Sequence, residues 1–421
     1  MNNQSNNKTN KLGTPWLWVP TLYLAEGIPF FIVTAISIPL LKQLGMPNGQ
    51  LALFTSLITF PWTLKPLWSP FVDVLKTKRW WIIAMQCLMV FSTLLIAFLA
   101  PRGFIAIALI LFTITAFASA THDIAADGFY MIALNDKQQS AFVGIRSVFY
   151  KLAGIYCQSF ILLLVGWLEK SYSAADSWQW VLLSLSALIA GIALWHNFKM
   201  PRAEQITEAK NIQSVFKEIG QIFVEFIHKK GIVLAIIFML LYRLPEALLL
   251  KLCTPFFLDP IEQGGLGLTM DQIGLYYGGI GVAMMLIGGV LGGLIADKYG
   301  LKRIIIWMCL CLTLPCIVYC YMAMVQPSSI WIIAACIGFE QFGYGLGYTA
   351  CMLYMIQVAK GEHKTAHFSF CTAIMFLGMM LPGLVAGYLQ EWLGYTTFFW
   401  LVMVCCIPSI LVTYLVYRKC D

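Results

Sequence analysis

Two stretches, Asp73-Val-Leu-Lys-Thr-Lys-Arg79 and Asp297-Lys-Tyr-Gly-Leu-Lys-Arg303, decide the fold of this chain. Each follows a long apolar run, and the matching Asp, Lys and Arg positions are separated by the same 224 residues. A charged hairpin that recurs at about half the length of a 421-residue chain indicates two related halves. Paired halves around a central site are typical of membrane transporters.

The composition is that of a protein embedded in a bilayer. Hydrophobic residues make up 60% of the chain, charged residues make up 11%, and the mean hydropathy is +0.79. Soluble domains contain about 25% charged residues. Twelve apolar segments are long enough to span a membrane: residues 16–41, 51–72, 80–100, 104–131, 141–167, 178–197, 231–258, 272–296, 303–324, 329–357, 365–390 and 394–417. Residues 1–11 are polar, so we expect no cleaved signal peptide.

The basic residues predict that both termini are cytoplasmic. With that orientation, 19 Lys and Arg residues lie on the cytoplasmic side, and only Lys42, Arg102 and Lys170 lie on the opposite side. This bias follows the positive-inside rule. The net charge of +7 then reflects topology and anionic lipid, so we predict no nucleic-acid partner.

The predicted fold class is an all-α membrane protein with twelve transmembrane helices in two six-helix bundles. We predict an N-terminal bundle over residues 1–197, a cytoplasmic linker over 198–230 and a C-terminal bundle over 231–421. Apolar residues recur at helical spacing over 212–227, which predicts an amphipathic linker helix on the membrane surface. The thirteen cysteines are scattered among apolar spans without histidines at ligand spacing, and no phosphate-binding loop is present. We therefore predict no metal, no cofactor and no ATP site.

Acidic residues within the spans occur on the first, fourth, seventh and tenth segments. They are Glu26, Asp123, Asp127, Glu246 and Glu340. An ionised side chain at the centre of a bilayer costs about 2.5–3.5 kcal/mol on insertion scales, so such residues usually face a partner or a wet cavity. We interpret these five as candidates for proton coupling.

Two alternatives remain for the acidic pair on the fourth segment. Asp123 and Asp127 share a helix face, and two nearby carboxylates repel each other, so one of them can carry a proton. Alternatively, both are paired with the fifth segment, which forms an antiparallel hairpin with the fourth. Equal distances from the hairpin tip predict the pairs Asp127–Arg146 and Asp123–Lys151. A structural role, proton coupling and substrate contact all stay open.

Other charges have two interpretations each. Lys65 either extends to the membrane interface or, with Arg243, attracts an anionic solute. Arg243 and Glu246 are three residues apart and can neutralise each other. Prolines beside these charges predict irregular backbone: Pro29, Pro66 and Pro245.

The repeated hairpins also have two interpretations. Asp73, Arg79, Asp297 and Arg303 either form a conformational latch or only set the topology. An acid near a helix C-terminus is unfavourable beside the macrodipole, so nearby cations must compensate for it.

The stretch from Gly293 to Arg303 resembles the loop signature of the major facilitator superfamily, whose members have twelve spans in two bundles. Lys65-Pro-Leu-Trp-Ser-Pro-Phe-Val-Asp73 looks like the second-span motif of the AmpG muropeptide permeases, a branch that also resembles acetyl-CoA transporters. Three further stretches look like elements of that branch: Glu26-Gly-Ile-Pro29, Ser119-Ala-Thr-His-Asp-Ile-Ala-Ala-Asp127, and Phe339-Glu-Gln341 followed by Gly343, Gly345 and Gly347. Ser69 and Lys76 replace signature glycines, and Glu26 and His122 depart from the residue types of the branch.

The resemblance implies a transporter of the bacterial inner membrane that imports anhydro-muropeptides with protons by alternating access. The solute and protons would be its partners within the lipid bilayer, and a monomer is favoured. Candidate substrate contacts are Lys65, Arg243 and Lys251 for carboxylates, Tyr23, Gln341 and Tyr344 for hydroxyls, and His122. The alternatives are another solute, such as a coenzyme A thioester, a sugar or a drug; a membrane acyltransferase, suggested by His122 beside Asp123; and a signalling receptor.

Overall fold

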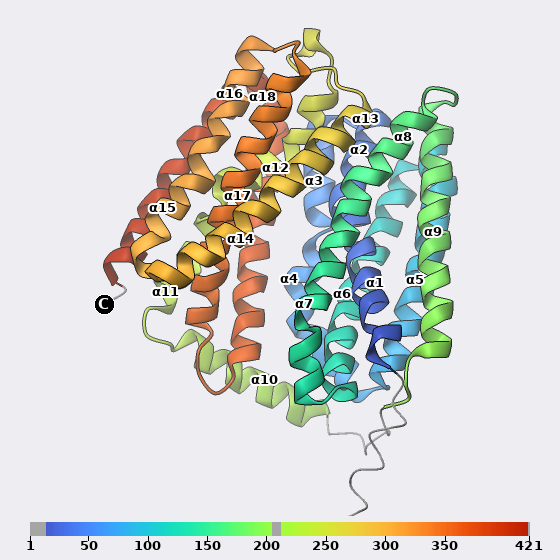
Figure 1. Ribbon diagram of the computed structural model, residues 1–421, viewed down its shortest axis with the longest axis vertical. Coiled ribbons are helices and arrows are strands. Elements are labelled where there is room, and N and C mark those ends of the chain that lie inside the picture. The colour runs from blue at the N-terminus through green and yellow to red at the C-terminus, as the bar shows by residue number, and fades with distance from the viewer. Residues whose placement is uncertain (1–13, 204–211, 420–421) are drawn as a thin grey trace, which may run out of the picture.

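The computed structural model describes residues 14–203 and 212–419, and every regular element in these ranges is a helix (Figure 1). Within the described ranges, ten helices are long and apolar enough to cross a membrane. Two more crossings come from the second expected span, which is divided into α3 and α4, and from α18, which contains two arms. The predicted twelve-span fold is therefore confirmed.

The first bundle contains six spans. They are η2, α1, η3 and α2 (Pro15–Leu17, Val19–Phe31, Ile32–Ile36, Ser37–Gln43); α3 and α4 (Asn48–Leu57, Phe60–Val74); α5 (Lys78–Leu99), continued by η4 (Ala100–Arg102); α6 (Ile105–Ala133); α7, η5 and α8 (Asp136–Ile155, Tyr156–Ile161, Leu162–Leu168); and α9 (Ala174–Lys199).

The second bundle also contains six spans. They are α11 and α12 (Ile232–Leu241, Leu244–Leu258); α13, η7 and α14 (Met270–Ile273, Gly274–Gly281, Val282–Tyr299); α15, η8 and α16 (Leu301–Thr313, Leu314–Cys316, Ile317–Val325); α17 (Ile330–Val358); and the two arms of α18 (Lys364–Lys419). A short η6 (Ile261–Gln263) lies between α12 and α13. Gly394 divides α18 with φ +73°, a left-handed conformation that glycine adopts readily.

Two of the three prolines expected to lie beside irregular backbone do so, and the third, Pro66, does not. The break between α11 and α12 lies beside Pro245, which cannot donate a backbone hydrogen bond. Pro29 lies inside α1 and is followed by the π-helical turn η3. In the second span, however, the break precedes Pro61, and Pro66 lies within the continuous helix α4.

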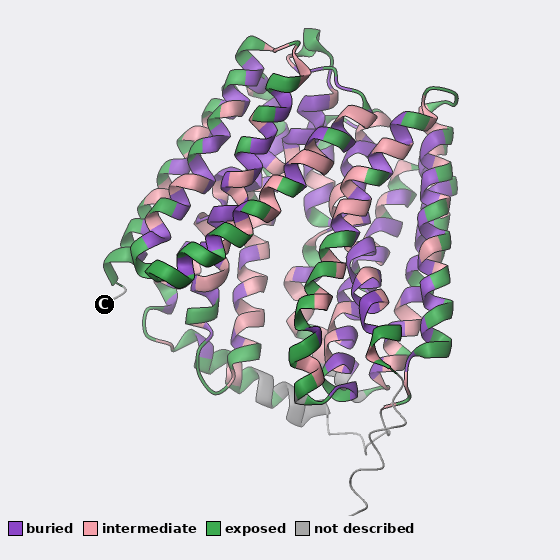
Figure 2. Cartoon of the chain, in the orientation of Figure 1, coloured by how far each residue is buried: buried purple, intermediate pink, exposed green. Residues whose placement is uncertain are grey.

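The outer faces of both bundles are apolar and exposed. Figure 2 shows exposed positions along outer helices such as α14, where large apolar side chains include Val290 and Leu294, 62% and 63% exposed. Soluble monomers rarely expose apolar surface so extensively. These faces are therefore suited to contact with lipid.

The bundles meet mainly toward one end of the molecule, which we call the closed end (upper end in Figure 1). There α3 packs against α18, α2 against α12, and α8 with η5 against α13 with η7. The opposite end, which we call the linker end, carries α10 (Ile212–Ile227) below the two bundles. The helix α10 lies in the segment for which an amphipathic linker helix is expected.

Candidate functional site

The first bundle contains a buried group of charges where α1, α4 and α6 meet. Lys65 of α4 forms an ion pair with Asp123 of α6, and the carboxyl group of Glu26 of α1 lies beside the same aspartate. Glu26 is only 9% exposed, and its buried Oε2 has no hydrogen-bond partner among the described residues. Asp123 therefore contacts one base and one acid at the same time.

A second pair lies one helical turn away on α6. Arg146 Nη2 of α7 is 2.6 Å from Asp127 Oδ1, and the Tyr23 hydroxyl donates to the same oxygen at 3.1 Å. The guanidinium also lies over the rings of Tyr23 and Tyr130, at 4.5 and 5.2 Å from their centroids. The predicted Asp127–Arg146 contact is confirmed.

The predicted Asp123–Lys151 pair is wrong, because Asp123 is paired with Lys65. The prediction matched depth along the hairpin but neglected helix rotation. From Arg146, a residue four positions on is rotated by about 40°, whereas Lys151, five positions on, is rotated by about 140°. By this rotation Tyr150, rather than Lys151, lies nearer the face of α7 that carries Arg146.

Two of these charged residues, Glu26 and Arg146, border a cavity. A cavity of about 220 Å³ is lined by Tyr23, Glu26, Arg146, Ser147, Tyr150 and Lys151. Although Asp127 lies within a spanning helix, its side chain is 40% exposed. The carboxylate can therefore be reached by water or by a solute.

The second bundle contains a matching buried pair at the break between α11 and α12. Arg243 donates to both carboxylate oxygens of Glu246, at 2.8 and 2.5 Å. It also donates to the Tyr344 hydroxyl at 3.1 Å and lies 4.8 Å from the ring centroid of Tyr348. Both members of the ion pair are buried, and the predicted mutual neutralisation is confirmed.

Glu340 lies on α17 without a basic partner among the described residues. Its Oε2 accepts a hydrogen bond from Gln341 Nε2 at 3.0 Å and lies 3.5 Å from the Tyr319 hydroxyl. Gln341, expected to bind a solute hydroxyl, therefore contacts its own neighbour. The tyrosine contact was not anticipated, since it joins side chains of two different spans, the ninth and the tenth.

The structure does not place His122 at the cavity. Its ring is fully buried, and its Nε2 lies 3.1 Å from Gln86 Nε2 of α5. Gln86 Nε2 in turn lies 2.8 Å from His196 Nδ1 of α9, whose Nε2 is 2.9 Å from the Thr21 hydroxyl. His122 precedes Asp123 by one position, about 100° of helix rotation, and so faces the packed side of α6.

Sequence reasoning missed a polar contact between the bundles at the closed end. Lys42 Nζ lies 2.6 Å from Asp259 Oδ1 and donates to Asn48 Oδ1 at 2.7 Å. Asn48 Nδ2 donates to Gln390 Oε1 at 2.7 Å, and the Tyr395 hydroxyl donates to Asp259 at 2.6 Å. We call these five residues the clasp. Lys42 was the available signal, since it is one of only three basic residues predicted outside the cytoplasm.

The clasp is reinforced at the start of α3. Glu391 of α18 accepts a hydrogen bond from the Gly49 backbone N–H at 2.8 Å. The first N–H groups of a helix have no partner within it, and the helix dipole favours a negative charge there. An acid from the second bundle thus satisfies a helix terminus in the first.

The repeated hairpins lie away from these charges. Asp297 and Arg303 are exposed, and Arg79 Nη2 donates to the Asn197 carbonyl at 2.5 Å. The side chain of Asp73 lies outside the described residues. Neither interpretation of the hairpins is tested by this arrangement.

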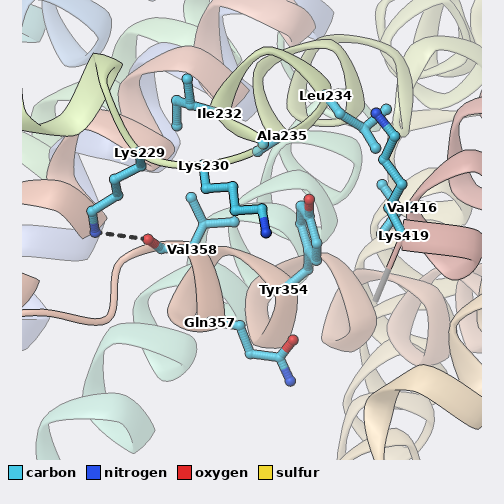
Figure 3. Close-up of a pocket in the computed structure, with 11 residues that line it drawn as sticks. Lys229, Lys230, Ile232, Leu234, Ala235, Tyr354, Gln357, Val358, Val416 and Lys419 are labelled. Atoms are coloured by element: carbon cyan, nitrogen blue, oxygen red, sulfur yellow. Dashed lines mark hydrogen bonds between the residues drawn. The ribbon is translucent and has the colours of Figure 1, made fainter. Parts of the chain in front are cut away.

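A second cavity, of about 230 Å³, lies at the linker end between α11, α17 and α18 (Figure 3). Lys229 lies beside it and donates from Nζ to the carbonyls of Val358 and Lys360, at 3.0 and 2.7 Å. The chain that follows α10 is thereby attached to the second bundle.

Two bundles of six helices around buried charges define a membrane transporter of the two-bundle class. The chain belongs to the major facilitator superfamily, because the Major Facilitator Superfamily family model matches residues 22–339 and 247–419. Since this is a family of transporters, the acyltransferase alternative is set aside.

Relatives carry the AmpG name at low identity. A Rickettsia typhi protein named "Putative transporter AmpG 2" is 26% identical over 372 residues, which cover 85% of each chain. A protein called AmpG 3 from Rickettsia prowazekii is 23% identical and covers 86% of this chain and 87% of its own. These similarities support the AmpG-like branch.

Solved structures share the fold. A bacterial homologue of the lysosomal transporter Spinster, in an inward-facing and unoccupied conformation, matches with a TM-score of 0.71 and 15% identity over 99% of this chain and 98% of its own. A D-xylose–proton symporter matches with a TM-score of 0.71 and 11% identity over 94% and 96%.

Proposed function

We propose that this protein is a proton-coupled secondary transporter that imports anhydro-muropeptides by alternating access. The observation that carries the proposal is the Glu26–Asp123–Lys65 group beside the cavity of the first bundle. The AmpG-named relatives support the choice of solute.

The proton is inferred from the contact between two acids. Two ionised carboxylates have only acceptor oxygens and repel each other, so the close approach of Glu26 and Asp123 is favourable only when one of them carries a proton. Lys65 pairs with Asp123 and stabilises its charged form, which leaves the proton on Glu26. Loss of that proton would place two negative charges beside one ammonium and favour rearrangement of the three helices.

The conformation follows from the predicted topology. If both termini are cytoplasmic, the linker end faces the cytoplasm and the closed end faces outward. The structure then corresponds to an inward-facing state of the cycle. A reporter fused after residue 419 tests this orientation, since a cytoplasmic C-terminus makes a fused fluorescent protein bright and a fused periplasmic phosphatase inactive.

Several features suit a solute with carboxylates and hydroxyls. Arg243 and Tyr344 lie together in the second bundle, and Tyr23 lines the cavity of the first. Lys251 is partly exposed at a contact between the bundles. A coenzyme A thioester, a sugar or a drug remains the alternative cargo.

The wider assignment has three further parts. We place the protein in the bacterial inner membrane as a monomer, with bundles over 1–197 and 231–421 and a linker over 198–230. Asp297 and Arg303, exposed in this state, would form part of a latch at the linker end when that end closes. Asp297→Asn should then change the transport rate more than the affinity for solute.

Reconstituted vesicles test the proposal directly. Purified protein in proteoliposomes should accumulate labelled anhydro-muropeptide when the outside is made acidic, and an uncoupler should abolish that accumulation. Competition by acetyl-CoA and by simple sugars identifies the alternative cargo. Uptake that is indifferent to the proton gradient would contradict the coupling, whereas uptake of a different solute would contradict only the cargo.

A further inference from the structure

Four basic side chains at or within the spans have carboxylate partners, whereas Lys251 and the exposed Lys151 have none among the described residues. The four pairs are Lys42–Asp259, Lys65–Asp123, Arg146–Asp127 and Arg243–Glu246. The polar contact of Lys251 is with the Thr55 hydroxyl, which lies 3.4 Å from its Nζ. That hydroxyl donates its own hydrogen to the Leu51 carbonyl at 2.7 Å, so it offers Lys251 only a weak, neutral acceptor.

Lys251 lies where α12 of the second bundle meets α3 of the first and the first arm of α18. A Cβ built on Gly383 of α18 would lie 3.2 Å from Lys251 Cε and 2.4 Å from Ser56 Oγ of α3. The missing side chain at Gly383 therefore leaves room for the lysine between the helices. Lys251 is partly exposed, while the Ser56 hydroxyl is buried without a hydrogen-bond partner.

The distance between Lys251 and the clasp shows where the lysine lies along the molecule. Lys251 precedes Asp259 by eight residues on the same helical segment, a separation of about 12 Å along the axis. Thr55 similarly follows Asn48 by seven residues, or about 10 Å. The ammonium thus lies directly inside the closed end, at a contact between bundles that must separate when that end opens.

An ammonium within the membrane is unfavourable unless an anion or a wet space compensates for it. At this site the described part of the chain supplies neither a carboxylate within 4.0 Å nor full exposure to solvent. We propose that Lys251 binds a carboxylate of the transported solute and so determines selectivity for acidic over neutral cargo. The identity of that cargo rests on the proposed function.

A single carboxylate fits the site better than a phosphate. Lys251 provides one compact positive charge, and the neighbouring Ser56 provides one hydroxyl that can donate a second hydrogen bond. A phosphate dianion would require more positive charge than one ammonium offers, and the basic side chains of the four pairs named above are already neutralised.

Matched pairs of solutes test the inference. Proteoliposomes are supplied with an anhydro-muropeptide whose carboxylates are free or converted to amides, and with other acid and amide pairs that include sugar acids. Wild type should prefer the acid. Lys251→Met should raise the KM for the acid at least about tenfold, since a charged hydrogen bond contributes about 1.5–3 kcal/mol, and leave the KM for the amide unchanged. Lys251→Arg should keep the preference.

The controls separate this inference from the proposed cargo. Lys199→Met changes an exposed lysine at the end of α9 and should leave both KM values unchanged. Retained acid preference in Lys251→Met, or equal uptake of acid and amide by wild type, would overturn the role of Lys251. Preference for a different acid, lost in Lys251→Met, would support Lys251 while refuting the muropeptide assignment. Monodisperse elution of Lys251→Met in detergent shows that it folds. Lys251→Arg, which keeps the positive charge, is the second variant that tests the role of Lys251.

Discussion

Asp123 contacts both an acid and a base, which makes it the most constrained charge of the first bundle. Its neighbour on the same helix face, Asp127, contacts Arg146 and a tyrosine and remains 40% exposed. Two carboxylates one turn apart therefore have different partners and different access to water. This difference predicts different roles for them.

Asp123→Asn should abolish accumulation driven by a pH gradient while preserving exchange of solute across the membrane. The amide keeps the size of the side chain but removes the charge that pairs with Lys65 and holds Glu26 protonated. Initial rates of uptake with and without an imposed gradient provide the measurement. Wild-type accumulation by this variant would exclude the carboxyl pair from coupling, and Glu26→Gln provides the matched test of the other acid.

Asp127→Asn and Arg146→Met should each lower the thermal midpoint, and the double variant should lose less than the sum. Removal of one partner leaves the other charge without compensation. Because both side chains are partly exposed, we expect a coupling energy of about 1 kcal/mol. A double-mutant cycle of midpoints in detergent measures this energy. Strict additivity would show that the contact contributes nothing to stability.

Among the helices, glycines allow the closest contacts between the two bundles. A Cβ on Gly387 of α18 would lie 1.9 Å from the Asn48 carbonyl of α3, and a Cβ on Gly278 of η7 would lie 1.9 Å from the Gln158 carbonyl of η5. Each of these two contacts joins an element of the second bundle to an element of the first: α18 to α3, and η7 to η5. The backbones can approach this closely only because both residues lack a side chain.

Gly387→Val and Gly278→Val should each disfavour the state in which the bundles are in contact at the closed end. A valine at either position must push the facing backbone away, whereas Gly191→Val on α9 meets open space and serves as the control. Spin labels on α3 and α18 measure the separation at this end by electron paramagnetic resonance. Distance distributions equal to those of wild type would show that the glycine contacts do not set the conformation.

For the whole molecule, the clasp defines a closed end at which the two bundles are in contact. The clasp uses side chains from α2, α3, α12 and α18, so it can exist only while the bundles touch. Its polar groups are largely buried and must be hydrated when the bundles separate. The clasp therefore biases the equilibrium between the two orientations of the transporter.

Asp259→Asn should shift the population toward the state in which the closed end is open. The substitution removes the charge that pairs with Lys42 but retains the size of the side chain. A loss of about 1.4 kcal/mol would change the population ratio tenfold. The measurement is the rate at which a thiol reagent labels a cysteine at Leu266, which is buried at this end. An unchanged labelling rate would show that the ion pair does not hold the end closed.

Much of the architecture could be predicted from sequence, since hydropathy and charge bias act locally along the chain. Twelve spans, two bundles and the Asp127–Arg146 and Arg243–Glu246 contacts require only helix periodicity and the cost of charge in a membrane. The partner of Asp123 was missed, because it depends on how α4 packs against α6. His122 was misplaced for the same reason, since rotation of α6 decides which face is packed.

By itself, the sequence determined which residues lie in the membrane, because transfer from water to lipid depends on composition over a short window. Tertiary structure decided which charges meet, since ion pairs act over a few ångströms between helices that are distant in sequence. Lys42 and Asp259 are 217 residues apart and meet only when two bundles dock. No local pattern encodes that contact, which is why the clasp and the unpaired Lys251 emerged only from the fold.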